Sequence, residues 1–393
     1  MLTRGELHER ISKLQTVIIA NHCDAVLIIQ NVDLYYYSGT MQNAQLSIPA
    51  TGEPVLFCRK SSERAKQECP WPVIALPNYK LIPEKLLAAG LKLPKRLGLE
   101  LDVIPTAAYF VCLKIFSNAD IVDASNWIRN QRSIKSPYEI EFLRQGGEKM
   151  ARVFSQVPQI LRPGISELEC AAEVERLARQ LGHQGCIRIR GYNQELFFGH
   201  LLAGENGAIA SFNDGATGGK GLGPFFPQGP SEKKIAVNEP IALDYVGVFD
   251  GYMVDQTRLF VIGSLPAKLC DAFQTALEIQ EEIIALVKPG IMADELYNIA
   301  LKRVENAGLS ENFMGYGPGR AKFVGHGIGL EMDELPVLAR GFHVPLEEGM
   351  VIALEPKFVF PGLGVVGIEN TWLVTKTGKE KITDFPDDLV VIK

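Results

Sequence analysis

One histidine and four carboxylates in apolar surroundings are the residues of this sequence best suited to chemistry. His326 lies in FVGHGIG, Asp244 and Asp255 lie in IALDYVGVFDGYMVDQTRLFVIG, and Glu355 and Glu369 lie in VIALEPKFVF and GVVGIENTWLVT. Buried acids are costly unless a cation or a metal ion neutralises them. Each acid taken alone is better explained as a surface or salt-bridged residue. Without four matching lysines or arginines, however, the set indicates a divalent ion, and its oxygen-rich donors with one imidazole suit Mn, Co, Fe or Zn.

Hairpins are the elements expected to position these acids. Asp244 and Asp255 stand eleven residues apart in two apolar strands joined by GVFDGY, with Gly251 at the turn. Such a hairpin brings both carboxylates onto one face of a sheet. Glu355 and Glu369 are fourteen residues apart, in two apolar runs separated by FPGLG, and the same geometry is expected for them.

Two segments of the roughly 260 residues that follow position 132 resemble each other. LRPGISELECAAEVERLARQLG (161–182) and VKPGIMADELYNIALKRVENAG (287–308) align without a gap, 126 residues apart. Any two helices bounded by Pro-Gly and Gly look alike, so the match could be accidental. Acid-bearing, strand-like segments follow both copies, which favours a duplicated α+β half-domain with ligands from both halves around a pseudo-twofold axis.

The first third of the chain has an α/β pattern. CDAVLIIQ and EPVLFCR are short apolar runs rich in branched residues, whereas LIPEKLLAAGLKL has helical spacing. Ser136 and Pro137 then begin a new helical pattern, because proline suits the first turn of a helix. The domain boundary is therefore placed near residue 132, giving domains 1–132 and 133–393.

Composition limits the classes of function. The 393 residues are 47% hydrophobic with a net charge of −6, which indicates neither nucleic acid nor a membrane as partner and leaves a small substrate as the default. No apolar run approaches the roughly 18 residues of a membrane span, and the amphipathic N-terminus lacks the apolar core of a signal peptide. Seven scattered cysteines without a C-x-x-C pair are expected to be reduced thiols in a cytoplasmic protein.

The order Asp, Asp, His, Glu, Glu, within LDYVGVFDGYMVDQTR, GHGIG, ALEP and GIENTWLVT, resembles the M24 metallopeptidases, the group of methionine aminopeptidase, prolidase and creatinase. ERISKLQ, CDAVLII and YYYSGT resemble the creatinase-type N-terminal domain, and RSIKSPYEIEFLR resembles its linker. The resemblance covers nearly the whole chain. It implies an α/β protein with a creatinase-like N-terminal domain followed by a C-terminal domain of the pita-bread fold with an internal pseudo-twofold repeat.

The resemblance also implies a centre with two divalent metal ions, manganese first, with cobalt, zinc or iron as alternatives. Asp244 would chelate one ion, His326 and Glu355 the other, and Asp255 and Glu369 would bridge both. Two cations activate a bridging water as a nucleophile and polarise the scissile carbonyl. Glu355 would in addition carry the proton of that water to the leaving amine. Where this N-terminal domain is present in the family, homodimers are usual.

Several positions depart from the pattern of the family. Asp333, seven residues after the glycine-flanked histidine, replaces a second histidine, and an ionised carboxylate can only accept hydrogen bonds. A histidine upstream of the first aspartate is also missing, and Gln228 is the nearest side chain able to hydrogen-bond there. His200 could enter the site from a neighbouring strand or serve a structural role. Gly367 replaces an arginine that recognises dipeptide carboxylates in prolidases, which argues against simple dipeptide specificity.

The segment 203–230 is rich in glycine and proline and precedes Asp244. It is interpreted either as a loop at the mouth of the site or as a flexible surface excursion. Arg320 and Lys322 could bind an anionic group of the substrate or be solvated.

The leading hypothesis is a metal-dependent hydrolase of a small peptide or amide, resembling Xaa-Pro dipeptidases and aminopeptidases, with Glu355, Asp333 and His200 as candidate catalytic residues. Two alternatives remain. The first is a non-peptidase enzyme on the same fold, either an amidinohydrolase or a lyase of a small zwitterion. The second is a pita-bread domain that has lost catalysis and acts as a binding protein.

Overall fold

The computed structural model describes residues 2–393, and the chain divides into two compact units, Met1–Arg132 and Ser133–Lys393. No helix in this described range is both long enough and apolar enough to span a membrane. Each unit has its own sheets and its own apolar core.

The first unit is built on one mixed six-stranded sheet with the order β4-β3-β2-β1-β5-β6. Strand β1 runs antiparallel to β2 and parallel to β5. The apolar runs expected to be strands form β1 and β3, and the N-terminal amphipathic segment forms a helix, α1. The strands are β1 (Ala25–Ile28), β2 (Ala44–Pro49), β3 (Val55–Cys58), β4 (Val73–Ala75), β5 (Arg96–Leu99) and β6 (Asp120–Asp123). The helices are α1 (Arg4–Ala20), α2 (Asn31–Ser38), α3 (Ser62–Glu68), α4 (Ile82–Ala88), α5 (Thr106–Ile115) and α6 (Ser125–Ser133).

The second unit begins with α7, and its local sequence explains where this helix starts. Ser136 accepts a hydrogen bond from the backbone of Glu139, the Glu139 side chain bonds back to Ser136, and Pro137 occupies the first turn. The first half of the unit then forms a four-stranded sheet with the order β17-β9-β8-β7. Its elements are α7 (Pro137–Phe154), α8 (Val157–Ile160), α9 (Glu167–Gln180), β7 (Gly199–Ala203), β8 (Ile241–Phe249) and β9 (Tyr252–Ile262), joined by the late strand β17 (Val390–Ile392).

The second half of this unit contains two helices and two further sheets. A five-stranded sheet has the order β11-β10-β12-β15-β16, and β13 and β14 form a two-stranded sheet. The elements are α10 (Ala267–Leu286), α11 (Ala293–Asn306), β10 (Phe323–Gly327), β11 (Glu334–Ala339), β12 (Val351–Leu354), β13 (Lys357–Phe360), β14 (Gly364–Gly367), β15 (Asn370–Thr375) and β16 (Gly378–Lys381).

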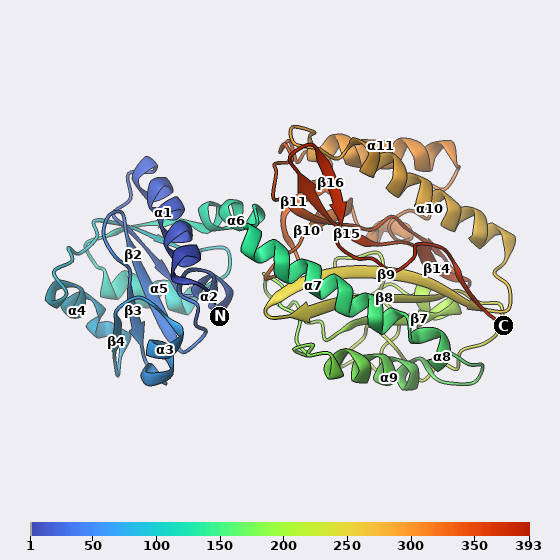
Figure 1. The fold of residues 1–393 in the computed structure, drawn as a ribbon, viewed down its shortest axis with the longest axis horizontal. Coiled ribbons are helices and arrows are strands. Elements are labelled where there is room, and N and C mark those ends of the chain that lie inside the picture. Colours follow the sequence, from blue (N-terminus) through green and yellow to red (C-terminus); the bar gives the residue numbers. More distant parts are fainter. Residues whose placement is uncertain (1) are drawn as a thin grey trace. The chain divides into compact units, whose positions relative to one another are not determined.

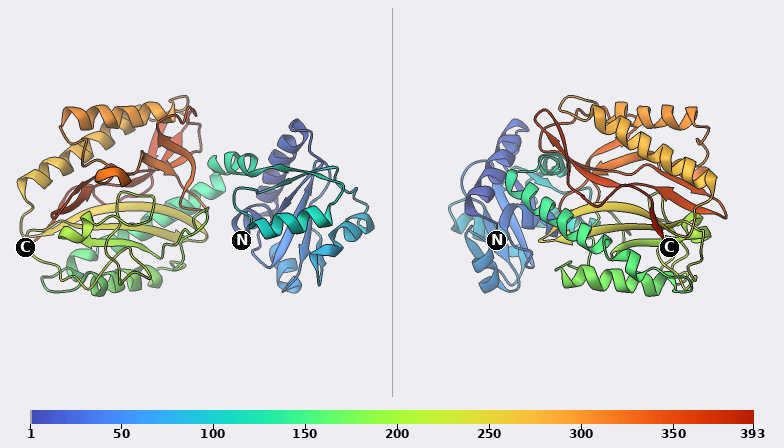
Figure 2. Two further views of the ribbon diagram at one scale, coloured as in Figure 1. Left: turned by 180° about the vertical axis from the view of Figure 1, so that it is seen from behind. Right: turned by 45° about the vertical axis from the view of Figure 1, so that its right-hand side comes forward.

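The two similar sequence segments form corresponding helices. Helices α9 and α11 begin at Glu167 and Ala293 and end at Gln180 and Asn306, so both ends keep the spacing of 126 residues. The helices lie on opposite outer sides of the second unit, with the sheets between them (Figures 1 and 2). Thr257 of β9 forms an isolated antiparallel bridge with Glu369, which connects the sheet of the first half to the chain of the second. The acid-bearing strands of both halves therefore meet in the interior.

The hairpin expected around Glu355 and Glu369 is divided into two pairs of strands. β12 pairs antiparallel with β15, and β13 pairs antiparallel with β14 in a separate sheet. The break falls at Pro356, which has no backbone N–H to donate to a ladder. Since Leu354 is opposite Asn370 in the last pair of β12 and β15, Glu355 and Glu369 lie opposite each other just beyond the end of this pairing.

Candidate metal centre

The expected acids and the histidine line one cavity in the second unit. Its volume is about 300 Å³. β8 supplies Asp244, β9 supplies Asp255, β10 supplies His326, and the segments after β12 and before β15 supply Glu355 and Glu369. Both halves of the unit thus contribute to a single site, as the internal repeat predicts.

The β8–β9 hairpin aligns its two aspartates. Asp244 is opposite Thr257, and Asp255 is opposite Val246. Side chains alternate between the two faces of a strand, so Asp255, two residues from Thr257, shares the face of Asp244. Gly251 at the turn has a φ of 92°, a conformation that glycine adopts without steric cost. The hairpin expected from the sequence is confirmed.

Two glycines allow His326 to approach the centre. A Cβ on Gly325 would lie 2.4 Å from the Ala353 carbonyl oxygen, and a Cβ on Gly327 would lie 2.1 Å from the Leu335 oxygen. Neither position could carry a side chain, because β10 is packed between β11 and β12. The imidazole Nδ1 lies 3.0 Å from the carbonyl oxygen of Gly327. A carbonyl can only accept, so Nδ1 carries a proton, and Nε2, which lies 3.7 Å from Glu355 Oε1, is the nitrogen left to bind a ligand.

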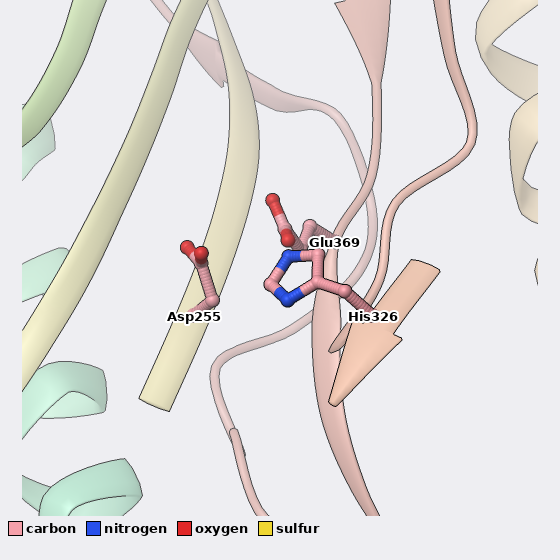
Figure 3. Close-up of side chains that lie close together, drawn as sticks. All are labelled: Asp255, His326 and Glu369. Atoms are coloured by element: carbon pink, nitrogen blue, oxygen red, sulfur yellow. The ribbon is translucent and has the colours of Figure 1, made fainter. Parts of the chain in front are cut away.

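Asp255, His326 and Glu369 converge from three segments (Figure 3), and their ligand atoms all lie within 4.8 Å of one another. All three side chains are buried. Within residues 2–393, Asp255 Oδ1 is a buried oxygen that has no hydrogen-bond partner. Buried polar atoms are rarely left unsatisfied. The site thus offers one imidazole nitrogen and two carboxylates, one of which has an oxygen without a partner. This set of donors fits a divalent cation.

A lysine that sequence reasoning did not include lies in the same cavity. The ammonium of Lys357 is 2.8 Å from Glu355 Oε2, 2.8 Å from Glu369 Oε2 and 3.0 Å from Asp244 Oδ2. Its side chain is 3% exposed. Sequence reasoning thus missed one cation that three of the four acids share, although the four acids still lack four matching lysines or arginines. A signal was present, because Glu355 and Lys357 are two residues apart in an extended segment and so share a face.

The charges divide the site into two regions. Burial opposes ionisation of Asp244, but Lys357 and His200 beside it lower its pKa to about 2. Burial and the neighbouring carboxylates of Glu369 and Asp244 raise the pKa of Asp255 well above its ordinary range. Burial also raises the pKa of Glu369, with Glu355 adding to the effect despite the contact with Lys357. Asp244 is thus stabilised in its charged form, whereas Asp255 and Glu369 favour their protonated forms unless a further cation is bound.

His200 and Gln228 lie together in the wall of the cavity. Strand β7 pairs His200 with Asp244, and the two ring nitrogens of His200 lie 3.0 Å from Thr217 Oγ1 and 3.3 Å from Gln228 Oε1. Thr217 in turn donates to Asp244 Oδ2 at 3.0 Å. Burial lowers the pKa of His200. Because Thr217 and Gln228 come from the segment 203–230, this glycine-rich segment forms part of the wall.

The adjacent acids Asp333 and Glu334 have different environments. Asp333 lines the cavity, its side chain is 47% exposed, and its Oδ1 lies 3.7 Å from His326 Nδ1. Glu334 is buried, pairs with Lys135 at 3.0 Å, and accepts hydrogen bonds from the backbone N–H groups of Leu330 and Glu331. Glu334 therefore fixes the loop that carries Asp333, and only Asp333 faces the cavity.

Arg320 lies elsewhere. It lines a separate pocket together with Tyr297 and Lys322, and its guanidinium donates to the carbonyl of Ser310. The interpretation of Arg320 and Lys322 as ligands of an anionic substrate group therefore has no support from their position relative to the acids.

Comparisons with known proteins identify relatives of the whole chain. A family model described as metallopeptidase family M24 matches residues 141–376, and one described as the creatinase/prolidase N-terminal domain matches residues 10–134. A protein named Xaa-Pro dipeptidase from Pyrococcus horikoshii is 29% identical over 391 residues, which cover 98% of this chain and 99% of the relative. The crystal structure of the prolidase from P. horikoshii has a TM-score of 0.82 at 27% identity, covering 97% of this chain and all of that chain. An Xaa-Pro dipeptidase from Bacillus anthracis has a TM-score of 0.83 at 23% identity, covering 98% and 99%.

Proposed function

The chain belongs to metallopeptidase family M24, and from this membership and the geometry of the cavity we propose that it hydrolyses short peptides at Xaa-Pro bonds. The observation that supports this best is the convergence of Asp255, His326 and Glu369, whose ligand atoms lie within 4.8 Å of one another. Asp255 Oδ1 is buried without a hydrogen-bond partner, and a bound cation would satisfy it.

A divalent ion would be held by Asp255, His326 and Glu369, and it would supply a polarised carbonyl and an acidified water. Manganese is our proposed ion, because oxygen donors with one imidazole suit it. The pair of ions that family resemblance implies is not part of the proposal. Asp244 and Glu355, the further expected ligands, each have a carboxylate oxygen hydrogen-bonded to Lys357.

Glu355 is the proposed proton carrier. One of its oxygens is held by Lys357 at 2.8 Å, and the other lies 3.7 Å from His326 Nε2. A carboxylate held in this way keeps one oxygen available to accept a proton and to pass it to a leaving amine. Asp333 at the exposed side of the cavity would accept a hydrogen bond from an ammonium or amide N–H of the substrate. His200, bound to Thr217 and Gln228, would keep Asp244 in place.

The cavity and the names of the relatives support a small peptide as substrate. A volume of about 300 Å³ is at the lower end of the range for small-molecule sites. Gly367 has no side chain that could bind the carboxylate of a dipeptide. We therefore expect peptides longer than a dipeptide to be cleaved at least as well as Xaa-Pro dipeptides.

The test is a panel of Xaa-Pro dipeptides, longer peptides with proline in the second position and non-proline controls. The protein would be stripped with a chelator and measured with and without Mn²⁺. Hydrolysis of the Xaa-Pro members that requires restored metal is the expected result. Metal binding without cleavage of any peptide would instead favour a different reaction on this fold, and absence of metal binding would exclude the metallohydrolase.

A homodimer and a cytoplasmic location, both expected from the sequence, remain proposals. Sedimentation equilibrium of the 43.3 kDa chain would test the dimer directly, with a species of twice that mass as the expected result.

A further inference from the structure

Lys357 occupies a position that a second metal ion would need. In the two-ion arrangement implied by the resemblance, Asp244 binds one ion and Glu369 bridges both. The Lys357 ammonium is within hydrogen-bond distance of one oxygen of each, 3.0 Å from Asp244 Oδ2 and 2.8 Å from Glu369 Oε2. The third contact, to Glu355 Oε2 at 2.8 Å, uses the last of the three N–H donors. A positive charge is thus already held where these carboxylates converge.

The buried ammonium of Lys357 opposes the approach of a second divalent ion. Asp244, Asp255, Glu355 and Glu369 together carry four negative charges when ionised, and Lys357 neutralises one of them. A single divalent ion would bring the net charge of these five groups to −1, and a second would bring it to +1. A second ion would bring a further double charge into contact with a buried ammonium, at a separation of only about 3 to 4 Å, where repulsion in a low dielectric is large.

The backbone keeps Lys357 in this position. It is the first residue of β13 and is paired with Gly367 of β14. A Cβ on Gly367 would lie 2.7 Å from the Cα and 2.7 Å from the Cγ of Lys357, and 2.6 Å from the carbonyl oxygen of Pro356. Glycine at position 367 therefore allows the lysine stem to cross the strand toward the acids. A larger side chain at position 367, such as the arginine that the family resemblance implies, would collide with the stem of Lys357.

We propose that Lys357 is a fixed cation in place of a second metal ion, so that the centre binds a single divalent ion through Asp255, His326 and Glu369. This inference rests on the proposed function only for the presence of that ion. It needs no assumption about the substrate, because the number of bound ions can be measured without turnover.

The first test uses the wild-type protein. The stripped protein is saturated with Mn²⁺, freed of excess metal and examined by elemental analysis and electron paramagnetic resonance. We expect about one ion per chain with the spectrum of an isolated Mn²⁺. About two ions per chain with a spin-coupled spectrum would overturn the inference but leave the proposed metallohydrolase intact. Absence of bound ions would overturn both.

The second test removes the ammonium. Lys357→Met and Lys357→Gln leave the carboxylates of Asp244, Glu355 and Glu369 without their cation, and we expect about two ions per chain and a spin-coupled spectrum. Lys233→Met is the matched control, because Lys233 pairs with Glu239 at 2.7 Å and does not line the cavity. It should keep the wild-type count.

A folded Lys357 variant that still binds only one ion would show that the ammonium is not what excludes a second, and the inference would fail. Folding is checked by circular dichroism before loading. If neither variant folds, the wild-type count and spectrum alone decide between one ion and two.

Discussion

A buried arginine that does not line the cavity holds the backbone of Glu369 in place. Arg258 of β9 is 0% exposed, and its Nη1 donates to the backbone oxygens of Thr257 and Glu369, both at 2.8 Å. Its Nη2 bonds to Asn370 and pairs with Asp387 at 2.8 Å. Burial lowers the pKa of Arg258 to about 10, so the residue remains charged at neutral pH. Arg258 thus holds the backbone that carries Glu369 in place from outside the cavity.

Replacing Arg258 by Met should therefore destabilise the protein. Several buried acceptors would lose their donor, and Asp387 would lose its partner, at a cost of about 3 to 5 kcal/mol. Urea unfolding of the stripped protein measures this directly. Arg258→Lys keeps the positive charge but has fewer N–H donors, so its free energy of unfolding should lie between those of the wild type and the Met variant. A loss below about 1 kcal/mol for the Met variant would contradict the assigned role.

Asp255→Asn should change stability and metal affinity in opposite directions. Burial and nearby carboxylates raise the pKa of Asp255, so its charge is unfavourable in the folded protein without metal. The neutral amide should make the stripped protein more stable by about 1 kcal/mol or more and weaken Mn²⁺ binding by at least about 100-fold. Thermal unfolding with and without Mn²⁺ reads out both effects. Unchanged affinity would refute Asp255 as a ligand.

At the scale of elements, features with a local signal could be predicted from the sequence. The α9 and α11 segments share Pro-Gly-Ile at the start and a glycine at the end, and they form corresponding helices. Gly251 indicates the turn between β8 and β9, and alternation places Asp244 and Asp255 on one face. The division of the second hairpin also had a local signal in Pro356, which lacks a backbone N–H. The path of the Lys357 side chain depends on packing between sheets, for which the sequence gives only the two-residue spacing from Glu355.

Helix α9 carries a carboxyl group that should make stability pH-dependent. Burial raises the pKa of Glu175 from 4.5 to about 7. The folded state thus binds the proton more tightly, so this stabilising contribution is present below pH 4.5 and is lost as the pH rises to about 7. Because solvent screens this partly exposed side chain, Glu175→Gln should gain about 1 to 2 kcal/mol relative to wild type at pH 8 and little at pH 4.5.

Denaturant unfolding at a series of pH values measures this difference. Glu173→Gln, which alters an exposed acid of the same helix paired with Arg176 at 2.9 Å, is the control and should show no such trend. A constant difference between Glu175→Gln and wild type across the series would contradict the assignment to Glu175.

At the scale of the whole molecule, family membership confirms the expected fold class, a creatinase-like N-terminal domain followed by a pita-bread domain. The residues of the proposed centre all lie between 244 and 369, within the second unit. The overall resemblance to metallopeptidases is thus retained, while Asp333 and Gly367 stand where the family resemblance implies a histidine and an arginine. Such local differences are where members of one fold acquire different specificities.

A ligand that binds only the folded chain stabilises it by mass action. Mn²⁺ at about 100 times its dissociation constant should therefore raise the free energy of unfolding by about 2.7 kcal/mol. Calorimetry with increasing Mn²⁺ tests this for the full chain, with Mg²⁺ as the comparison ion because it requires more regular oxygen coordination. A melting temperature that does not respond to Mn²⁺ would contradict a folded-state site.

The most direct test of a metal centre with a built-in lysine cation is a crystal structure of the Mn²⁺-loaded protein with anomalous data at the manganese edge. We expect one anomalous peak per chain, among Asp255, His326 and Glu369, with the Lys357 ammonium still hydrogen-bonded to Asp244. Two peaks, with Lys357 displaced from the carboxylates, would contradict it, as would a cavity without any peak.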